Sequence, residues 1–146
     1  MRKGENMYPE KYETDPTRRS PWIVFERGRL FIMGRSIIEN PSVFYEPALS
    51  WVSGYTKEWT GRTKIILGFE YINTGSTKWL YILIRELLEL RNMPENTEIF
   101  WYFEHGDEDM RDLGNILKSL VECEVTMIEV ENMNGRLYRN LLSQNN

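Results

Sequence analysis

The sequence predicts a single α/β domain in which helices pack against a mostly parallel, mixed sheet of about five strands. Short β-type segments alternate with longer segments of helical period in the order ββαβαβαβ, which is typical of parallel sheets with helical crossovers. Two of the β-type segments are nearly continuous in apolar residues, as expected of central strands. The chain has 146 residues, of which 41% are hydrophobic, enough for one core but short for two.

The first two strands are expected at residues 22–26 and 29–34, because Arg27 and Gly28 between them give the spacing of a tight hairpin. The first helix is expected to begin at Asn40 and Pro41, since asparagine suits the N-cap and proline the first helical position. Apolar residues at helical spacing predict its buried face: Phe44, Ala48, Trp51, Val52, Tyr55 and Trp59.

The central strands are expected at residues 63–73 and 97–104, with both faces covered, and a last strand at 125–130. The helix between the central strands has an apolar stripe of Leu80, Leu83, Ile84 and Leu87, with Leu88 beside it. A third helix at residues 107–121 has its stripe at Met110, Leu113, Leu117, Leu120 and Val121.

Both ends of the chain are expected to lie outside this domain, which we place at residues 21–131. Residues 1–20 carry nine charged side chains and few apolar ones, a composition that predicts a disordered tail. Residues 132–146 form a C-terminal extension in which "RLYRNLL" is long enough for one or two helical turns.

Composition excludes several classes of protein. The single cysteine, Cys123, rules out an intrachain disulfide, and no apolar run is long enough to cross a bilayer. The first residues lack the apolar core of a signal peptide. The net charge of -4 argues against a nucleic-acid-binding face. We therefore expect a cytoplasmic protein without membrane insertion and without a nucleic-acid partner.

Three polar loops are expected at one edge of the sheet. The strands ending at Gly34, Asn73 and Glu104 are followed by "GRSIIEN", "NTGST" and "EHGDED", and each loop introduces a helix. Because the carboxyl ends of parallel strands share one edge, where α/β folds usually place their sites, this edge is the candidate site.

The helical phase of the second loop places Thr74 on the solvent side. Thr74, Lys78, Tyr81, Arg85 and Glu89 share the outer face, whereas Thr77 and Ser76 fall on the inner side. A hydroxyl at this position has two interpretations. Thr74 or Ser76 is a helix cap, or the helix start is a place for a phosphate, which the free N–H groups and the positive helix end both favour.

The segments "GRSIIEN", "FYEPALSWV", "FEYINTGSTKWL" and "WYFEHGDEDM" resemble the SiaC family of bacterial regulatory phosphoproteins, which are similar to the STAS-domain anti-sigma factor antagonists. The resemblance spans about residues 21 to 130 and implies a STAS-like fold. The sequence differs from the family pattern at Gly75, where a serine is common, and at Ile38, where a proline is common.

The resemblance implies a non-enzymatic partner switch without a cofactor. A Ser/Thr kinase of the histidine-kinase-like ATPase type would phosphorylate the protein, and a PP2C-type phosphatase would reverse the modification. The unmodified form would bind a target such as a diguanylate cyclase. The family's phosphorylated threonine falls on Thr74, with Ser76 as the alternative. This is the kind of switch associated with biofilm regulation.

The residues expected to bind partners come from all three loops and from the outer face of the helix, where an exposed Tyr81 is a plausible anchor. They are Arg35, Ser36, Glu39, Asn73, Gly75, Ser76, Lys78, Tyr81, Arg85, Asp107 and Asp109.

Two other hypotheses remain open at this point. Glu104, Asp107, Glu108, Asp109 and Asp112 would suit a hard metal ion, which makes a small metal-dependent enzyme the second reading. The same acids also favour a helix start, and the EF-hand spacing is absent, so no metal site is assigned. The third hypothesis is a constitutive adaptor in which Thr74 only caps. "GSTK" lacks the order of a phosphate loop, and no pairing of a nucleophile with His105, the one histidine, is evident.

Overall fold

The computed structural model describes residues 10–89 and 94–144, which form six strands and four helices. The strands are β1 (Lys11–Thr14), β2 (Trp22–Glu26), β3 (Arg29–Ser36), β4 (Thr63–Ile72), β5 (Thr97–Glu104) and β6 (Glu124–Val130). The helices are α1 (Pro41–Glu58), α2 (Thr74–Leu88), α3 (Glu108–Leu120) and α4 (Gly135–Leu142). None of the helices in these described ranges is long and apolar enough to cross a membrane.

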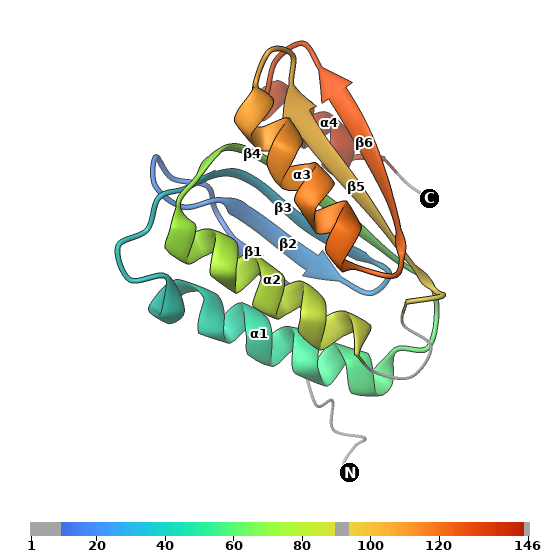
Figure 1. Ribbon diagram of the computed structural model, residues 1–146. Helices are drawn as coiled ribbons and strands as arrows, with labels where there is room; N and C mark the ends of the chain where they lie inside the picture. The colour runs from blue at the N-terminus through green and yellow to red at the C-terminus, as the bar shows by residue number, and fades with distance from the viewer. Residues whose placement is uncertain (1–9, 90–93, 145–146) are drawn as a thin grey trace.

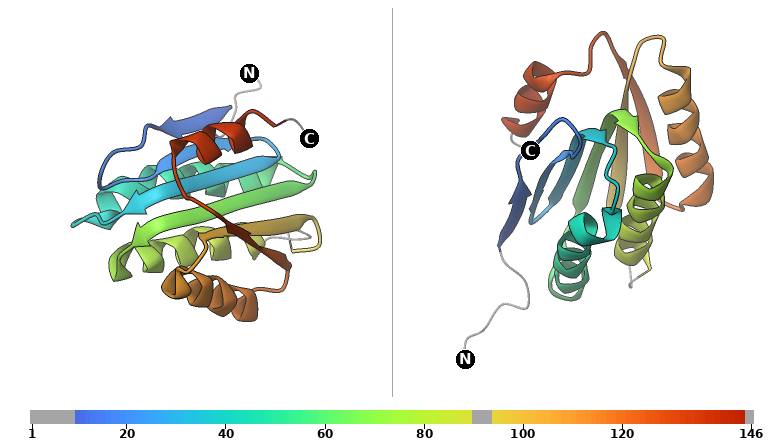
Figure 2. Two further views of the ribbon diagram at one scale, coloured as in Figure 1. Left: turned by 90° about the horizontal axis from the view of Figure 1, so that it is seen from above. Right: turned by 90° about the vertical axis from the view of Figure 1, so that its left-hand side faces the viewer.

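The six strands form one sheet in chain order, β1 to β6. β1, β2 and β3 pair antiparallel, whereas β3, β4, β5 and β6 pair parallel. Helices α1, α2 and α3 cover one face, and α4 lies on the other (Figures 1 and 2). The mostly parallel mixed sheet with packed helices confirms the predicted fold class, with one strand more than the expected five.

Local sequence explains the hairpin between β2 and β3. Gly28 has a φ of +86°, a conformation that glycine adopts without strain, and its N–H donates to the Tyr55 hydroxyl at 3.0 Å. The first helix begins at Pro41 as predicted, but the side chain of Asn40 makes no capping hydrogen bond. It accepts from the Ser42 hydroxyl instead.

The third helix is rotated relative to the predicted stripe. Leu120 was expected inside, yet it is 64% exposed, whereas Gly114 is buried. A Cβ on Gly114 would lie 2.5 Å from Trp101 Cδ1, so the bare glycine lets α3 approach the Trp101 ring. Six residues separate Gly114 from Leu120, which places them roughly 120° apart around the helix. Leu120 therefore lines a surface depression between α2 and α3.

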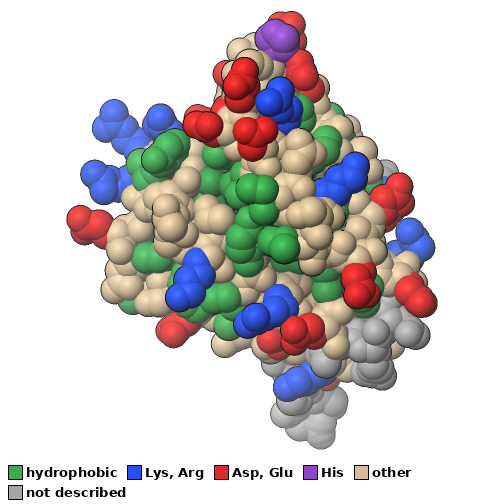
Figure 3. Space-filling model, in the orientation of Figure 1, with side chains coloured by type: hydrophobic (Ala, Val, Ile, Leu, Met, Phe, Trp, Pro, Cys, Tyr) green, Lys and Arg blue, Asp and Glu red, His purple; other side chains and the backbone are tan. Residues whose placement is uncertain are grey.

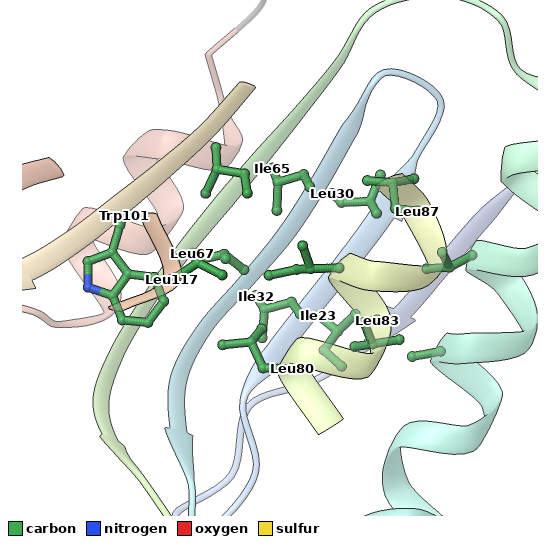
Figure 4. Close-up of a cluster of buried hydrophobic side chains, with 14 of the residues drawn as sticks. Ile23, Leu30, Ile32, Ile65, Leu67, Leu80, Leu83, Leu87, Trp101 and Leu117 are labelled. Carbon is green, nitrogen blue, oxygen red and sulfur yellow. The ribbon is translucent and has the colours of Figure 1, made fainter. Parts of the chain in front are cut away.

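The main core lies between the sheet and helices α1 to α3 (Figure 4). The predicted α2 stripe is buried in full: Leu80, Leu83, Ile84 and Leu87 are each at most 4% exposed. Burying one such side chain contributes about 1.5 to 3 kcal/mol, so this stripe fixes the rotation of α2 and with it the outward direction of Thr74.

The two central strands differ in how they are covered. The middle of β4 is buried on both faces, as expected. β5 alternates instead, with Ile99, Trp101 and Phe103 inside and Phe100 and Tyr102 half-buried. The expectation of two covered faces is wrong for β5, because α4 packs against β2, β3 and β4 and leaves the far side of β5 partly open.

The predicted domain boundaries are too narrow. Residues 1–20 were expected to be a tail, but Lys11–Thr14 form β1, which pairs with β2, and Tyr12 packs on Phe25 with ring centroids 6.1 Å apart. An edge strand tolerates outward charges, which is why charge density misled the prediction. Residues 1–9 lie outside the described residues.

The C-terminal extension also belongs to the folded unit. The expected one or two helical turns form α4, and its Tyr138 and Leu141 are buried in a second apolar cluster with Val24, Phe31 and Ile66 of the sheet. Residues 145–146 lie outside the described residues.

Candidate functional site

Asn73 caps helix α2. Its Oδ1 accepts a hydrogen bond from the Ser76 N–H at 2.9 Å, and its backbone oxygen accepts from the Thr77 N–H at 2.9 Å and the Thr77 hydroxyl at 3.0 Å. Its Nδ2 donates to the Ile38 oxygen, which joins the first polar loop to the second. The sequence-based alternatives in which Thr74 or Ser76 caps the helix are therefore wrong.

Thr74 is the first residue of α2 and is exposed. Within the part of the chain that the structure describes, its hydroxyl makes no hydrogen bond. The N–H groups of Thr74 and Gly75 lie in the first helical turn, where an α-helix offers them no acceptor. A phosphate on Thr74 would thus lie beside free donors at the positive end of a helix.

Gly75 is where α2 comes close to α1. A Cβ on Gly75 would lie 3.1 Å from Pro41 Cγ, tighter than an ordinary contact. Gly75 has no positive φ, so it is needed for space and not for a turn of the backbone. The missing side chain lets the starts of the two helices lie side by side.

A cluster of buried hydroxyls lies beneath this junction. Ser36 Oγ and Tyr45 Oη are 2.6 Å apart, and Ser36 and Ser76 are both fully buried. Ser76 Oγ makes no hydrogen bond within the described residues, although it lies near enough to Tyr45 to lower the pKa of that hydroxyl. Burial raises the pKa of Tyr45 to about 12, against smaller lowering effects of Ser36 and Ser76.

This burial corrects the expectation for two residues. Ser36 and Ser76 were expected to contact a partner, with Ser76 as the alternative phosphorylation site, but neither side chain reaches the surface. The contacts between β3, α1 and α2 enclose both hydroxyls. Thr74 is the accessible hydroxyl of the two candidates.

The outer face of α2 carries the expected polar residues. A surface depression on this face is lined by Thr74, Thr77, Lys78, Tyr81, Ile82 and Arg85. Lys78 and Arg85 are exposed, and Arg85 Nε lies 3.9 Å from Glu89 Oε2. Tyr81 is half-buried and not fully exposed as expected, and this partial burial raises its pKa.

A second depression continues this one between α2 and α3. It shares Tyr81 and Arg85 and is otherwise mainly apolar, with Ile84, Leu88 and Leu120 among its walls. Figure 3 shows hydrophobic side chains gathered on this surface. Charged and apolar groups thus lie next to each other along α2, as is common at protein interfaces.

The remaining residues of the first loop are at the surface. Glu39 is exposed, and Arg35 is exposed on β3, with its Nε 3.8 Å from Glu70 Oε1. Tyr71, which the sequence analysis did not select, is paired with Arg35 and 55% exposed. The pairing of β3 with β4 shifts by one residue between Gly34 and Arg35, which changes the direction of the side chains at the end of β4. The alternation of apolar and polar residues in the sequence does not predict this shift.

The acidic loop performs structural roles. Asp107 caps α3 by accepting from the Met110 N–H at 3.2 Å, and Glu104 accepts from the Met133 N–H at 2.8 Å. His105 Nδ1 contacts Glu129, which raises the pKa of His105. Asp109 is exposed. Across residues 10–89 and 94–144, no group of three or more side chains is arranged to hold a metal ion.

The acidic loop is also set apart from the other two. β4 and β5 pair only as far as Gly68 and Tyr102, and beyond these residues β4 pairs with β3 and β5 with β6. The loop before α3 and the loop before α2 therefore diverge (Figure 1). The predicted common edge is confirmed for the first two loops, which Asn73 joins, whereas Asp107 and Asp109 lie apart from them.

These features define a small α/β domain whose candidate site is an exposed hydroxyl at a helix start beside a partly apolar groove. The chain matches a family model described as "SiaC family regulatory phosphoprotein" over residues 14–130, and it therefore belongs to the SiaC family. This assignment confirms the resemblance seen in the sequence. Because the family consists of regulatory phosphoproteins, it also confirms the expectation of a protein that is not an enzyme.

Solved structures support the fold. The crystal structure of apo-SiaC from Pseudomonas aeruginosa has a TM-score of 0.69 and 19% identity, covering 82% of this chain and 99% of that chain. SiaC from the same organism, in complex as activator with the diguanylate cyclase SiaD, has a TM-score of 0.75 and 19% identity, covering 82% and 99%. Comparison with curated proteins by sequence gives no match.

Proposed function

We propose that this protein is a phosphorylation-controlled partner switch and that Thr74 is the switch residue. The observation that carries the proposal is the position of Thr74: it is the exposed first residue of α2, and Asn73 performs the capping. Its hydroxyl is therefore available to a kinase without loss of a structural hydrogen bond.

The electrostatics of the helix start explain why the fold would tolerate the phosphate. Phosphorylation adds about -1.5 to -2 charges. At a helix N-terminus such a charge is favourable by about 0.3 to 1 kcal/mol. Lys78 follows Thr74 by four residues on the same helix, the spacing at which opposite charges interact. The folded structure should remain while its surface changes.

The surface that changes is the one suited to a partner. Unmodified, the depression beside Thr74 carries the cations Lys78 and Arg85 next to the ring of Tyr81. A phosphate of about two negative charges would offset the charge of Lys78, one helical turn away, and add bulk at one end of the depression. A partner fitted to the neutral threonine would then lose affinity through desolvation and repulsion.

The proposed partners are those that the family resemblance implies. We propose a Ser/Thr kinase of the histidine-kinase-like ATPase type, a PP2C-type phosphatase, and a diguanylate cyclase as the target of the unmodified form. SiaC from Pseudomonas aeruginosa is described as an activator in complex with such a cyclase, which supports the last of these. A STAS-like, anti-sigma factor antagonist-like mode of switching, a cytoplasmic location and a role in biofilm regulation belong to the same proposal.

The test is the intact mass and site mapping of the chain purified from its own cells. We expect a population heavier by one phosphate, located at Thr74 and absent from Thr74→Ala. Thr77→Ala is the matched control, because it removes a threonine hydroxyl that is bonded to the Asn73 oxygen. A phosphate that persists in Thr74→Ala would show that another residue is the switch.

A further inference from the structure

The segment from Met133 to Leu142 lies beyond residue 130, where the family match ends. It crosses the sheet face opposite α1, α2 and α3 (Figure 2). Met133, Tyr138 and Leu141 are buried there against side chains of β2, β3 and β4. The segment is therefore part of the folded unit and not a loose appendage.

The sheet has a recess for this segment at Gly68. A Cβ on Gly68 would lie 2.8 Å from Met133 Cε and 3.0 Å from the backbone oxygen of Tyr102. Glycine weakens the interior of a strand, so its presence in the middle of β4 calls for a close approach of other atoms. Met133 supplies that approach.

Polar contacts connect the segment to the candidate edge. The Tyr138 hydroxyl donates to Glu70 Oε2 at 2.6 Å, and Glu70 Oε1 lies 3.8 Å from Arg35 Nε. Glu70 is the residue that the register skips between the pairs Gly34–Phe69 and Arg35–Tyr71. The bulge thus presents the Glu70 carboxylate to Tyr138 on one side and to Arg35 on the other.

The two contacts differ in strength. Tyr138 is 4% exposed and donates to the Glu70 carboxylate at 2.6 Å, a short and strong hydrogen bond. The Arg35 side chain is 50% exposed, and an ion pair so open to water contributes little by itself. Burial, and next the hydrogen bond to Glu70, raise the pKa of Tyr138.

We propose that Tyr138 and Glu70 are positioning residues for Arg35, so that the C-terminal helix sets the geometry of the partner-binding edge. Tyr138 fixes the carboxylate, and the fixed carboxylate orients the guanidinium. The inference rests on the proposed function, because Arg35 belongs to the surface expected to bind partners. It assigns to Tyr138, which lies outside the family match, an effect on partner choice.

The first test needs only the full chain and no partner. Nuclear magnetic resonance of the Arg35 Nε–H group reports how fast its proton exchanges with water. Tyr138→Phe retains the ring and its packing but removes the donor. We expect faster exchange in Tyr138→Phe, by about twofold, because the contact that is lost is an ion pair open to water. Glu70→Gln, which removes the charged partner itself, should speed exchange at least as much. The double variant should add nothing further.

Tyr102→Phe is the matched control. Tyr102 packs against the same apolar cluster, and its hydroxyl makes no hydrogen bond within the described residues. We expect it to leave Arg35 exchange unchanged. Unchanged exchange in Tyr138→Phe, or additive effects of Tyr138→Phe and Glu70→Gln, would overturn the inference.

The second test measures affinity for the diguanylate cyclase. Arg35→Ala and Tyr138→Phe should weaken binding, and their combination should be no weaker than Arg35→Ala alone. Full affinity of Tyr138→Phe alongside weakened Arg35→Ala would overturn the role at the edge. If even the wild-type chain fails to bind the cyclase, the proposed target is wrong, and the Arg35 exchange data still decide whether Tyr138 and Glu70 position Arg35.

Discussion

The side-chain oxygen of Asn73 accepts the N–H of Ser76 at 2.9 Å, so the residue before Thr74 caps the helix that Thr74 begins. This hydrogen bond assigns the capping of α2 to Asn73 and not to Thr74. Asn73 carries the local stability, and Thr74 is left exposed beside it. The consequences can be measured residue by residue.

Replacing Asn73 should destabilise the protein through loss of the cap. We expect Asn73→Ala to lower the free energy of unfolding by about 1 kcal/mol, measured by urea denaturation. Asn40→Ala is the matched control, because Asn40 holds the same position before α1 but makes no capping hydrogen bond. Equal losses for the two variants would contradict the assignment of Asn73 as the cap.

A negative charge should be tolerated at Thr74 and not at Ser76. Thr74→Asp places a carboxylate at an exposed helix start, and we expect stability within about 1 kcal/mol of wild type. Ser76→Asp places the same group in a fully buried position and should cost about 2 kcal/mol or more. Thermal melting of both variants checks this, and a Thr74→Asp that melts as early as Ser76→Asp would show that α2 does not tolerate charge at its start.

Filling the recess at Gly68 should displace the C-terminal segment. Gly68→Ala puts a methyl group 2.8 Å from Met133 Cε, and we expect a loss of about 1 to 3 kcal/mol from overpacking. In the Met133→Ala background, Gly68→Ala should cost less, although the backbone oxygen of Tyr102 still limits the space. A double-mutant cycle by urea denaturation measures the coupling, and strictly additive losses would argue against contact between the two residues.

Alkaline pH should destabilise the fold through Tyr45. Its pKa is raised from 10.0 to about 12 by burial, so the unfolded chain loses this proton before the folded one does. The associated stability is complete below pH 10 and is lost as pH rises toward 12, by about 2 to 3 kcal/mol. Tyr45→Phe should have a flatter decline over this range in urea denaturation. An unchanged slope would mean that Tyr45 is ionised equally in both states.

Periodicity predicted the parts of the fold that depend on large apolar faces. The α2 stripe and strand β5 appeared where the sequence placed them, because leucine spacing fixes which side of a helix is buried. Strand β1 was missed since an edge strand of polar residues has no such pattern. Leu120 was misplaced because the contact of Gly114 with Trp101, which rotates α3, joins distant parts of the chain.

The candidate site was predictable in position but not in detail. The helical periodicity of α2 alone predicted that Thr74 faces solvent, and Thr74 is exposed in the structure. The sequence suggested Thr74 or Ser76 as the cap, whereas the extended backbone of Asn73 makes that residue the cap. The burial of Ser36 depends on Tyr45 of another element, and the Tyr138–Glu70 bond spans 68 residues. Contacts between residues of different elements cannot be predicted from the local pattern of apolar and polar residues.

The most direct test of the account is the affinity of the diguanylate cyclase for three forms of this chain, unmodified, phosphorylated at Thr74, and Thr74→Ala, with thermal melting of each. We expect the unmodified and Thr74→Ala forms to bind alike, the phosphorylated form to bind at least about tenfold more weakly, and all three to melt within a few degrees of each other. Equal affinity of the phosphorylated and unmodified forms would contradict the central claim that Thr74 is the switch.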